Sequence, residues 1–410
     1  MRIRSSGLTL VMGLSILVAA CSSSGASTAP STAATTPPTT APSTEASAAP
    51  SGSAAAPSGS AAHSDLKIGV VTDVGTVNDK NFNEYTYVGA QQGAAAIGAD
   101  PPPVVVPNSD ADYAPLIQAF VDQQFDIIVA TGFNLVPATV AAAKANPNIW
   151  FIGVDHFPCI TETGDVDNAN PPKCAGDVSK LLPNYIAINY AEDQAGYLAG
   201  IVAAKATKSN IIGAIGGVSL CGPCVRYMQG YTLGAKATNP AVKVKTAFVS
   251  ASDFKVGFAD QAAGKTFATQ FIAQNPGIDV LFQVAGLTGN GIIDAACAAN
   301  INAVGVDVDQ HQSYPASVPC IITSAEKHLS VSVADSIEAI SAKTAKGGLT
   351  FFNATNDGVG VSPFYDAASK LPADIQTTLD AATAAIKAGT LVTCPPAPDC
   401  GKTPAPKIGD

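Results

Sequence analysis

Residues 67–83 read KIGVVTDVGTVNDKNFN and join a short apolar run to a polar loop and a helix start. The run Ile68–Val71 is typical of a buried strand, which ends at Thr72. In open α/β sheets the ligand binds beyond the carboxyl ends of the strands, so the loop after this run is a candidate binding segment. Its candidate contacts are Asp73, Asp79, Phe82 and Asn83.

Outward from this stretch, β-branched runs of strand length alternate with alanine-rich segments of helical length and period. Expected strands lie at residues 68–71, 104–106, 126–130, 149–154, 186–188, 211–215, 242–249, 280–284, 303–306 and 320–323. Expected helices lie at residues 83–97, 113–123, 137–145, 192–205, 226–238, 260–274, 291–299 and 330–346. This alternation predicts an α/β fold with doubly wound parallel sheets.

The chain that follows residue 63 is longer than one hydrophobic core usually supports, so two lobes joined by a hinge are expected. We expect the chain to cross between them near 182–187 and to return near 305–310. Lobe 1 then comprises residues 64–185 and about 308–346, and lobe 2 comprises residues 186–307 and about 347–393. Residues 394–410 form a C-terminal tail.

The first 63 residues read as targeting and spacing segments. Arg2 and Arg4 precede an apolar stretch that ends in small residues before Cys21, which resembles a bacterial lipoprotein signal (residues 1–20) with Cys21 as the lipidated residue. Ordinary secretion without the lipid is the alternative. Residues 21–63 are rich in Ser, Thr, Ala and Pro and predict a disordered tether with a mean reach of about 35–40 Å. The expected location is the extracytoplasmic face of a cell membrane.

The composition argues against polyanionic partners. The chain has 22 Lys and Arg against 32 Asp and Glu, which gives a formal net charge of −10. Such a charge disfavours binding to nucleic acid. The histidines show no metal-binding spacing, and no cofactor motif is complete: Gly264-Lys265-Thr266 lacks the upstream glycine of a phosphate-binding loop. We therefore expect no metal and no cofactor.

Eight cysteines follow Cys21, and an even number in an exported chain predicts disulfides. Eight cysteines allow 105 pairings, so the sequence leaves the connectivity open. Pairing neighbours along the chain gives Cys159–Cys174, Cys221–Cys224, Cys297–Cys320 and Cys394–Cys400.

Polar residues follow several of the expected strands, where a ligand would bind. Asp155 and Asp307 each end the same string, Gly-Val-Asp, and Gly286 follows residues 280–284. Lys327 follows residues 320–323 closely and can neutralise a neighbouring carboxylate. A single aspartate at a strand end is often only a helix cap, but several that converge favour a binding cleft.

These residues, together with strings along most of the chain, resemble the basic membrane protein family of ABC-importer solute-binding lipoproteins. The matching strings are TDVG (72–75), DKNFN (79–83), FIGVD (151–155), EDQAGYLAG (192–200), GY (230–231), GAK (234–236), GFAD (257–260), AG (285–286), TGNG (288–291) and GVDVDQ (305–310). The resemblance implies a type I periplasmic-binding-protein fold. It also implies a purine nucleoside as solute and an ABC importer, with its permease and ATPase, as partner.

The resemblance also implies roles for individual residues. Phe82 and Phe258 would stack on the two faces of a base, and Asp155 would read its edge. The ribose would be held by Asn83, Asp307 and Lys327, and Gly286 would allow close backbone approach. Asp73 is a weaker assignment, and Asp79 is expected to cap a helix. Core packing is the alternative for the two phenylalanines.

Three features depart from the family pattern. Asn81 stands where the family usually has Ser, an insertion with Cys159 and Cys174 follows Asp155, and the Cys221–Cys224 loop replaces a turn. The insertion, residues 156–183, is expected to be held by its disulfide, and it lies close enough in sequence to Asp155 to cover the site.

Two other functions compete with solute delivery. Cys221-Gly222-Pro223-Cys224 has the spacing of thiol-disulfide oxidoreductases, and a helix start lowers a thiol pKa. A structural disulfide is the alternative, because the motif lies far beyond the first strand-helix unit. A solute sensor without transport is the second competitor. No Gly-x-Ser-x-Gly nucleophile motif occurs, so the sequence favours a binding protein over an enzyme.

Overall fold

The computed structural model describes residues 63–317, 319–396 and 399–401. The expected signal peptide, the lipidation site Cys21 and the tether up to residue 62 lie outside the described residues.

The described part contains two six-stranded sheets. In strand order, the first is β11 (Gly348–Phe352), β5 (Tyr185–Tyr190), β4 (Trp150–Val154), β3 (Ile127–Thr131), β1 (Ile68–Val71) and β2 (Val104–Val105). The second is β12 (Val359–Val361), β10 (Ile321–Lys327), β9 (Asn302–Asp307), β8 (Val280–Val284), β6 (Ile211–Val218) and β7 (Lys243–Ser250).

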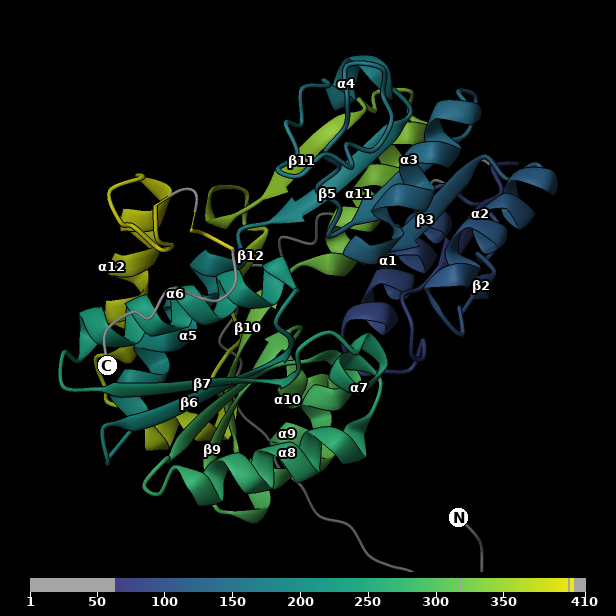
Figure 1. The fold of residues 1–410 in the computed structure, drawn as a ribbon. Helices are drawn as coiled ribbons and strands as arrows, with labels where there is room; N and C mark the ends of the chain where they lie inside the picture. Colours follow the sequence, from purple (N-terminus) through teal and green to yellow (C-terminus); the bar gives the residue numbers. More distant parts are fainter. Residues whose placement is uncertain (1–62, 318, 397–398, 402–410) are drawn as a thin grey trace, which may run out of the picture. The chain divides into compact units, whose positions relative to one another are not determined.

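Strand pairing within the sheets is parallel, except that β12 runs antiparallel to β10. Helices cover both faces of each sheet (Figure 1). In lobe 1, α1 (Phe82–Ala96) packs with α11 (Leu329–Ser341), and α2 (Tyr113–Asp122) packs with α3 (Val136–Ala145). In lobe 2, α5 (Glu192–Ala206) packs with α6 (Gly222–Thr238), and α8 (Gln261–Gln274) packs with α9 (Gly286–Ala298). The expected pair of doubly wound α/β lobes is confirmed.

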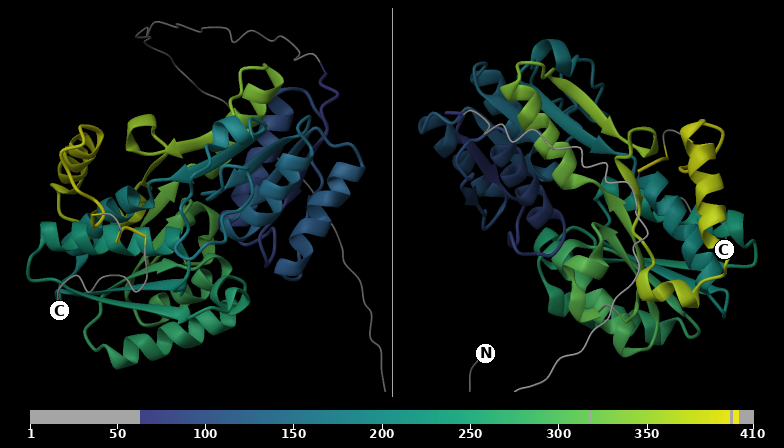
Figure 2. Two further views of the ribbon diagram at one scale, coloured as in Figure 1. Left: turned by 45° about the horizontal axis from the view of Figure 1, so that its top comes forward. Right: turned by 180° about the vertical axis from the view of Figure 1, so that it is seen from behind.

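The central strands are buried along their whole length, which explains why they read as continuous apolar runs. Every residue of β1, β3 and β8 is buried. A parallel sheet covered on both faces has no solvent side, so its strands need no polar alternation. The short helices are α4 (Val178–Leu181), α7 (Phe254–Phe258) and α10 (Gln310–Ser313), whereas the longer α12 (Ile375–Lys387) packs on α5 (Figure 2).

Two of the family strings serve helix packing. A methyl group on Gly200 of α5 would lie 2.2 Å from the carbonyl oxygen of Tyr231, and one on Gly234 of α6 would lie 2.0 Å from that of Tyr197. Neither distance is sterically possible, so glycine at these positions lets the two helix backbones touch. The strings at 192–200 and 230–236 therefore hold lobe 2 together and do not line the site.

The lobe boundaries expected from the sequence are wrong at three strands. Tyr185–Tyr190 joins the first sheet beside β4, Ile321–Lys327 joins the second sheet beside β9, and Gly348–Phe352 joins the first sheet beside β5. The order of strands and helices along a chain does not state which sheet a strand joins. That choice depends on pairing register, which forms only in the folded protein.

The chain consequently passes between the lobes three times, after β5, after β10 and after β11. These connections are bonded to one another through the backbone: the amide of Ala191 donates to the carbonyl of Phe352 at 2.9 Å, and that of His328 donates to Gly358 at 3.0 Å. Three adjoining connections are the expected architecture of a hinge between two lobes.

The structure contains the four disulfides that pair neighbouring cysteines along the chain, Cys159–Cys174, Cys221–Cys224, Cys297–Cys320 and Cys394–Cys400. The insertion at 156–183 is closed by the first of them and by a backbone bridge between Ile160 and Val166. Among the described residues, no helix is long and apolar enough to span a bilayer.

Candidate functional site

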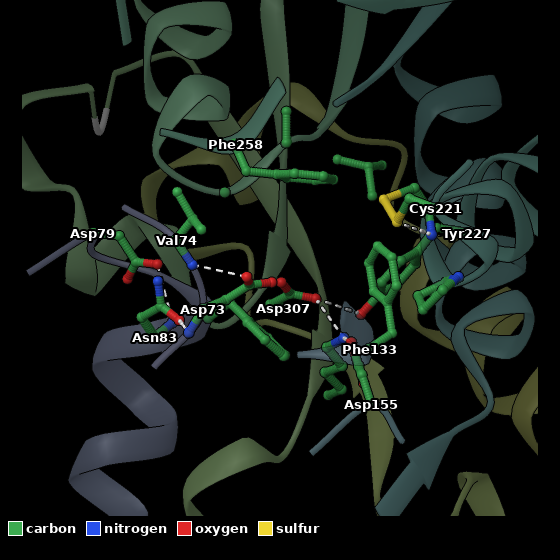
Figure 3. A pocket seen from close by; sticks show the side chains of 17 residues that line it. Asp73, Val74, Asp79, Asn83, Phe133, Asp155, Cys221, Tyr227, Phe258 and Asp307 are labelled. Carbon is green, nitrogen blue, oxygen red and sulfur yellow. Dashed lines mark hydrogen bonds and ion pairs between the residues drawn. A yellow bond between two sulfur atoms is a disulfide. The ribbon is translucent and has the colours of Figure 1, made fainter. Parts of the chain in front are cut away.

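A pocket lies between the carboxyl ends of strands from both sheets (Figure 3). Its empty space, which includes space open to solvent, is about 590 Å³. Lobe 1 contributes Asp73, Val74, Asp79, Phe82, Asn83, Phe133 and Asp155. Lobe 2 contributes Cys221, Pro223, Cys224, Tyr227, Phe258, Val284, Ala285, Gly286, Asp307 and Lys327. The structure therefore brings all eight expected site residues to one pocket.

A buried ion cluster joins the two lobes at this pocket. Lys327 Nζ donates to Asp155 Oδ2 at 2.6 Å and lies 3.4 Å from Asp307 Oδ1. The Lys327 side chain is 2% exposed. Burial raises the pKa of both carboxyl groups, although the nearby ammonium opposes the shift. One lysine between two carboxylates leaves the cluster with a net negative charge.

One carboxylate oxygen of Asp155 has no hydrogen-bond partner among the described residues. Its Oδ2 is engaged by Lys327, whereas the buried Oδ1 accepts no hydrogen bond from any residue that the structure describes. A buried polar atom without a partner is costly, so such an atom in a pocket wall needs a donor from elsewhere. A bound molecule with an N–H or O–H group would supply it.

Asp155 and Asp307 hold equivalent places in the two lobes, because Asp155 follows β4, Asp307 is the last residue of β9, and each of these strands is the third from the same end of its sheet. Both have left-handed backbones, with φ of 60° and 64°. This conformation is uncommon for a residue other than glycine. Here it turns the backbone at the carboxyl end of each strand. The same Gly-Val-Asp string precedes the turn in both lobes.

Aromatic rings surround the ammonium group. Lys327 Nζ lies 4.7 Å from the ring centre of Phe82, 5.3 Å from that of Tyr190 and 5.9 Å from that of Tyr227. Cation–π contacts of this length stabilise a buried charge. Across the pocket, Phe258 is stacked on Phe254 with ring centres 6.3 Å apart. Both Phe82 and Phe258 thus have a fixed partner inside the protein and a place in the pocket wall.

Asp73 and Asn83 are bound to each other within the first loop. The amide of Asp73 donates to Asn83 Oδ1 at 3.2 Å, and Asn83 Nδ2 donates to the carbonyl of Thr76 at 3.3 Å. Asp73 Oδ1 accepts from Tyr113 at 2.5 Å. Burial raises the pKa of Asp73 to about 6. The loop conformation thus fixes both side chains before any ligand arrives.

Asp79 has the expected capping geometry at the start of α1. Its carboxylate accepts from the backbone amides of Asn81 at 2.9 Å, Asn83 at 3.0 Å and Glu84 at 3.1 Å. Burial raises the pKa of Asp79 to about 7, and the three amide donors oppose the shift. Asp79 also lines the pocket. Its hydrogen bonds to the first amides of α1 fix the start of the helix, which carries Phe82 and Asn83.

Gly286 has a backbone that favours glycine. Its φ is +53°, and an added methyl group would lie 3.3 Å from the carbonyl oxygen of Phe258. A side chain here would be strained and would press on the segment that carries Phe258.

Several pocket residues were missed by the sequence reasoning. Phe133 follows β3, and Tyr227 lies one helical turn after Cys224, with its hydroxyl donating to Asp307 Oδ1 at 3.2 Å. The position of Phe133 shortly after β3 is the same strand-end signal that identified Asp155. None of residues 156–183 lines the pocket, so the structure does not place the insertion in its wall.

The lobes are in contact around the pocket. Asn290 Nδ2 of lobe 2 donates to the carbonyl of Asp79 in lobe 1 at 2.9 Å, and Ser313 Oγ donates to that of Lys80 at 2.8 Å. The rings of Phe133 and Phe254 lie 5.8 Å apart across the same boundary. Together with the Lys327–Asp155 pair, these contacts hold the lobes in a closed arrangement. The described residues contain no cluster of three or more potential metal ligands.

Comparison with known proteins agrees with the fold. The family model for PnrA-like ABC transporter substrate-binding proteins, Bmp, matches residues 66–384. The ABC transporter nucleoside-binding protein BmpA of Lactococcus lactis subsp. cremoris is 30% identical over 336 residues, which are 76% of this chain and 87% of that protein. Basic membrane protein A of Borreliella burgdorferi is 27% identical over 64% of this chain and 68% of its own length.

Solved structures of ABC transporter solute-binding proteins share the fold. One from Aeropyrum pernix K1 has a TM-score of 0.65 at 22% identity and covers 81% of this chain and 94% of its own. Another, from Conexibacter woesei, has a TM-score of 0.59 at 21% identity and covers 80% and 98%. The two lobes thus form the periplasmic-binding-protein fold. With more than half of its length matched by the family model, the chain belongs to the Bmp family of PnrA-like ABC transporter substrate-binding proteins.

Proposed function

We propose that this protein binds a nucleoside, with a purine base favoured, between its lobes and delivers it to an ABC importer. The observation that carries the proposal is the buried Oδ1 of Asp155, a pocket-lining residue, which has no hydrogen-bond donor among the described residues. The N–H groups of a base are donors of the required kind. The nucleoside named for the Lactococcus lactis relative supports the same solute class.

The proposed pose places the base between Phe82 and Phe258, with its edge at Asp155. Asn83, Asp307 and Lys327 then hold the ribose, Gly286 lets the backbone approach the solute, and Asp73 supports Asn83. Stacking on an aromatic ring contributes about 1–3 kcal/mol per base, and fixed carboxylates reject solutes that lack the matching donors. No step in this function makes or breaks a covalent bond.

The charges of the pocket favour a neutral solute. Asp73, Asp79, Asp155 and Asp307 are carboxylic acids, and Lys327 is the single basic side chain among the described lining residues. Lys327 is already paired with two of these acids. A phosphate group would enter a site of like charge without a cation available to it, so nucleotides are expected to bind far more weakly than nucleosides.

Lipid anchoring at Cys21 completes the proposal. An anchored protein with a tether of about 35–40 Å would hold its binding lobes near an importer on the extracytoplasmic face of the membrane. Relatives from Pyrococcus that are named lipoproteins support this location. Mass spectrometry of the mature protein would test it. A mature protein whose N-terminal residue is unmodified and is not Cys21 contradicts the anchor.

Calorimetric titration with adenosine, guanosine, inosine, uridine, free bases, ribose and nucleoside monophosphates tests the solute. We expect nucleosides to bind and Phe258→Ala to weaken their binding about 5-fold to 150-fold, from the stacking energy. Phe351→Ala is the matched control, because Phe351 lies on an edge strand away from the pocket and is 49% exposed. If no nucleoside binds at millimolar concentration, or if both variants bind equally, the proposed solute is wrong.

Thiol-disulfide exchange is the less favoured function. Its reactive sulfur must be reached by a partner protein, whereas Cys221 is 2% exposed and Cys224 is 4% exposed. In this arrangement of the lobes, a second protein cannot contact either sulfur.

A further inference from the structure

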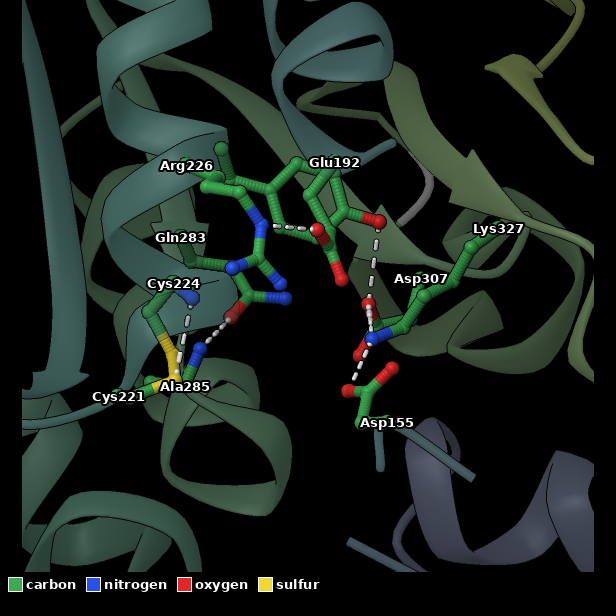
Figure 4. Close-up of a disulfide and its surroundings, with 10 residues drawn as sticks. Asp155, Glu192, Cys221, Cys224, Arg226, Gln283, Ala285, Asp307 and Lys327 are labelled. Atoms are coloured by element: carbon green, nitrogen blue, oxygen red, sulfur yellow. Dashed lines mark hydrogen bonds and ion pairs between the residues drawn. A yellow bond between two sulfur atoms is a disulfide. The ribbon is translucent and has the colours of Figure 1, made fainter. Parts of the chain in front are cut away.

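The Cys221–Cys224 disulfide occupies an unusual place for a structural crosslink, because it forms part of the pocket wall. Both cysteines and the intervening Pro223 line the pocket. Figure 4 shows the disulfide on one side of the view and Lys327 with Asp155 and Asp307 on the other. The disulfide and the ion cluster therefore line the same pocket.

Residues 399–401 contact the same loop and the helix that follows it. An added methyl group on Gly222 would lie 3.6 Å from the carbonyl oxygen of Gly401. Gln229, two turns further along α6, donates to the carbonyl of Asp399 at 3.0 Å and accepts from the amide of Gly401 at 2.9 Å. Because both cysteines line the pocket, a small reductant that enters the pocket can reach their sulfurs.

The disulfide is also part of the start of α6. Cys221 is the N-cap residue, and its Sγ accepts from the amide of Cys224 at 3.1 Å. A helix N-terminus stabilises a thiolate, so reduction would place negative charge beside a pocket that already carries several carboxylates. Reduction would also let the two sulfurs move apart, which changes this part of the pocket wall.

We propose that the Cys221–Cys224 disulfide is a solute-contacting wall of the pocket and that its reduction weakens solute binding. This inference rests on the proposed function. The reaction consumes a dithiol reductant: the protein S–S bond breaks, an S–S bond forms in the reductant, and two electrons pass to Cys221 and Cys224. Of the two protons that the reductant gives up, one stays on a cysteine sulfur as a thiol, and the other goes to solvent when the second sulfur is held as a thiolate at the helix N-terminus. Bound solute and reductant then exclude each other, because they use the same pocket.

Linkage makes the effect reciprocal. If the solute binds the disulfide form tenfold more tightly than the dithiol form, saturating solute lowers the reduction potential of this pair by about 30 mV. Cys159–Cys174 serves as an internal reference, because Cys174 is exposed and neither cysteine lines the pocket.

The first test compares the affinity of oxidised wild type, dithiothreitol-reduced wild type, C221S/C224S and the control C159S/C174S for adenosine, guanosine and inosine. We expect at least tenfold weaker binding for the reduced protein and for C221S/C224S, and unchanged binding for the control. Equal affinity of oxidised wild type and C221S/C224S overturns this inference and leaves the proposed function standing. Absence of nucleoside binding by the oxidised wild type overturns both.

The second test uses the unaltered chain and is independent of how well the serine variant folds. The rate of reduction by dithiothreitol is followed by alkylation of each cysteine pair and mass spectrometry, with and without saturating guanosine. We expect guanosine to slow reduction of Cys221–Cys224 at least tenfold and to leave Cys159–Cys174 unchanged. Equal slowing of both pairs, or of neither in a protein that binds guanosine, contradicts the inference.

Discussion

Lys327→Met should destabilise the protein strongly, because it removes the cation that joins two buried carboxylates. Lys327 Nζ lies 2.6 Å from Asp155 Oδ2 and 3.4 Å from Asp307 Oδ1, in a site where the lysine side chain is 2% exposed. Methionine keeps most of the side-chain volume and loses the charge. Breaking a buried ion pair from one side costs about 3–5 kcal/mol, which is a large part of a typical free energy of unfolding.

The sign of the pH dependence follows from the direction of the pKa shifts. Burial raises the pKa of Asp155 and Asp307 above the values of an unfolded chain, and Lys327 opposes this rise. Without the lysine, the folded-state pKa values rise further. Acids with a raised folded-state pKa lose stability as the pH rises through that value. The deficit of the variant should therefore be greatest above neutral pH and should shrink as the pH falls toward 5.

Urea unfolding at pH 5 and pH 7.5 measures this deficit. Trp150 is the single tryptophan of the chain, so its fluorescence reports on lobe 1, while circular dichroism reports on both lobes. Lys387→Met is the matched control. Lys387 pairs with Asp357 at 2.9 Å on the surface, and the loss of such a pair costs about 0–1 kcal/mol. The reasoning is refuted if Lys327→Met is as stable as the control at pH 7.5, or if its deficit is the same at both pH values.

Three further predictions concern single side chains. Burial and the nearby Asp309 raise the pKa of Glu326 to about 7. Glu326→Gln should therefore raise the melting temperature at pH 8 and not at pH 4. Glu338 is exposed, so Glu338→Gln should leave the melting temperature unchanged at both pH values. Tyr227→Phe removes a donor to Asp307 and should cost about 1–3 kcal/mol in urea unfolding, whereas Tyr231→Phe, whose buried hydroxyl has no partner among the described residues, should cost nothing. Gly286→Ala should cost about 1–2 kcal/mol and weaken nucleoside binding in calorimetry, because its φ is +53°; Gly360→Ala, with open space around it, is the control. Equal effects of a variant and its control would contradict the respective prediction.

Much of the site was predictable from sequence, because a physical rule connects strand ends to ligand sites. Asp155, Gly286 and Asp307 were found as the residues that follow apolar runs, and the structure places all three in the pocket. The roles of Phe82, Asn83 and Lys327 came from the family resemblance. Tyr227 was missed because it lies on a helix, where the strand-end rule does not apply.

The redox motif illustrates a different limit. Its spacing in the sequence was clear, and a disulfide forms between Cys221 and Cys224. Whether the sulfurs face solvent, the core or the pocket depends on how the start of α6 is placed against β8 and the C-terminal segment. Only that placement shows that they line the pocket and are shielded from a partner protein.

The sequence by itself determined the alternation of strands and helices, the presence of two lobes and the residues at the strand ends, since each depends on local pattern and on position within one strand or helix. The tertiary structure decided which strands join which sheet and where the hinge lies. It also decided that Lys327 of lobe 2 pairs with Asp155 of lobe 1. Pairing register and contacts between lobes join residues distant in the chain, and no local pattern encodes them.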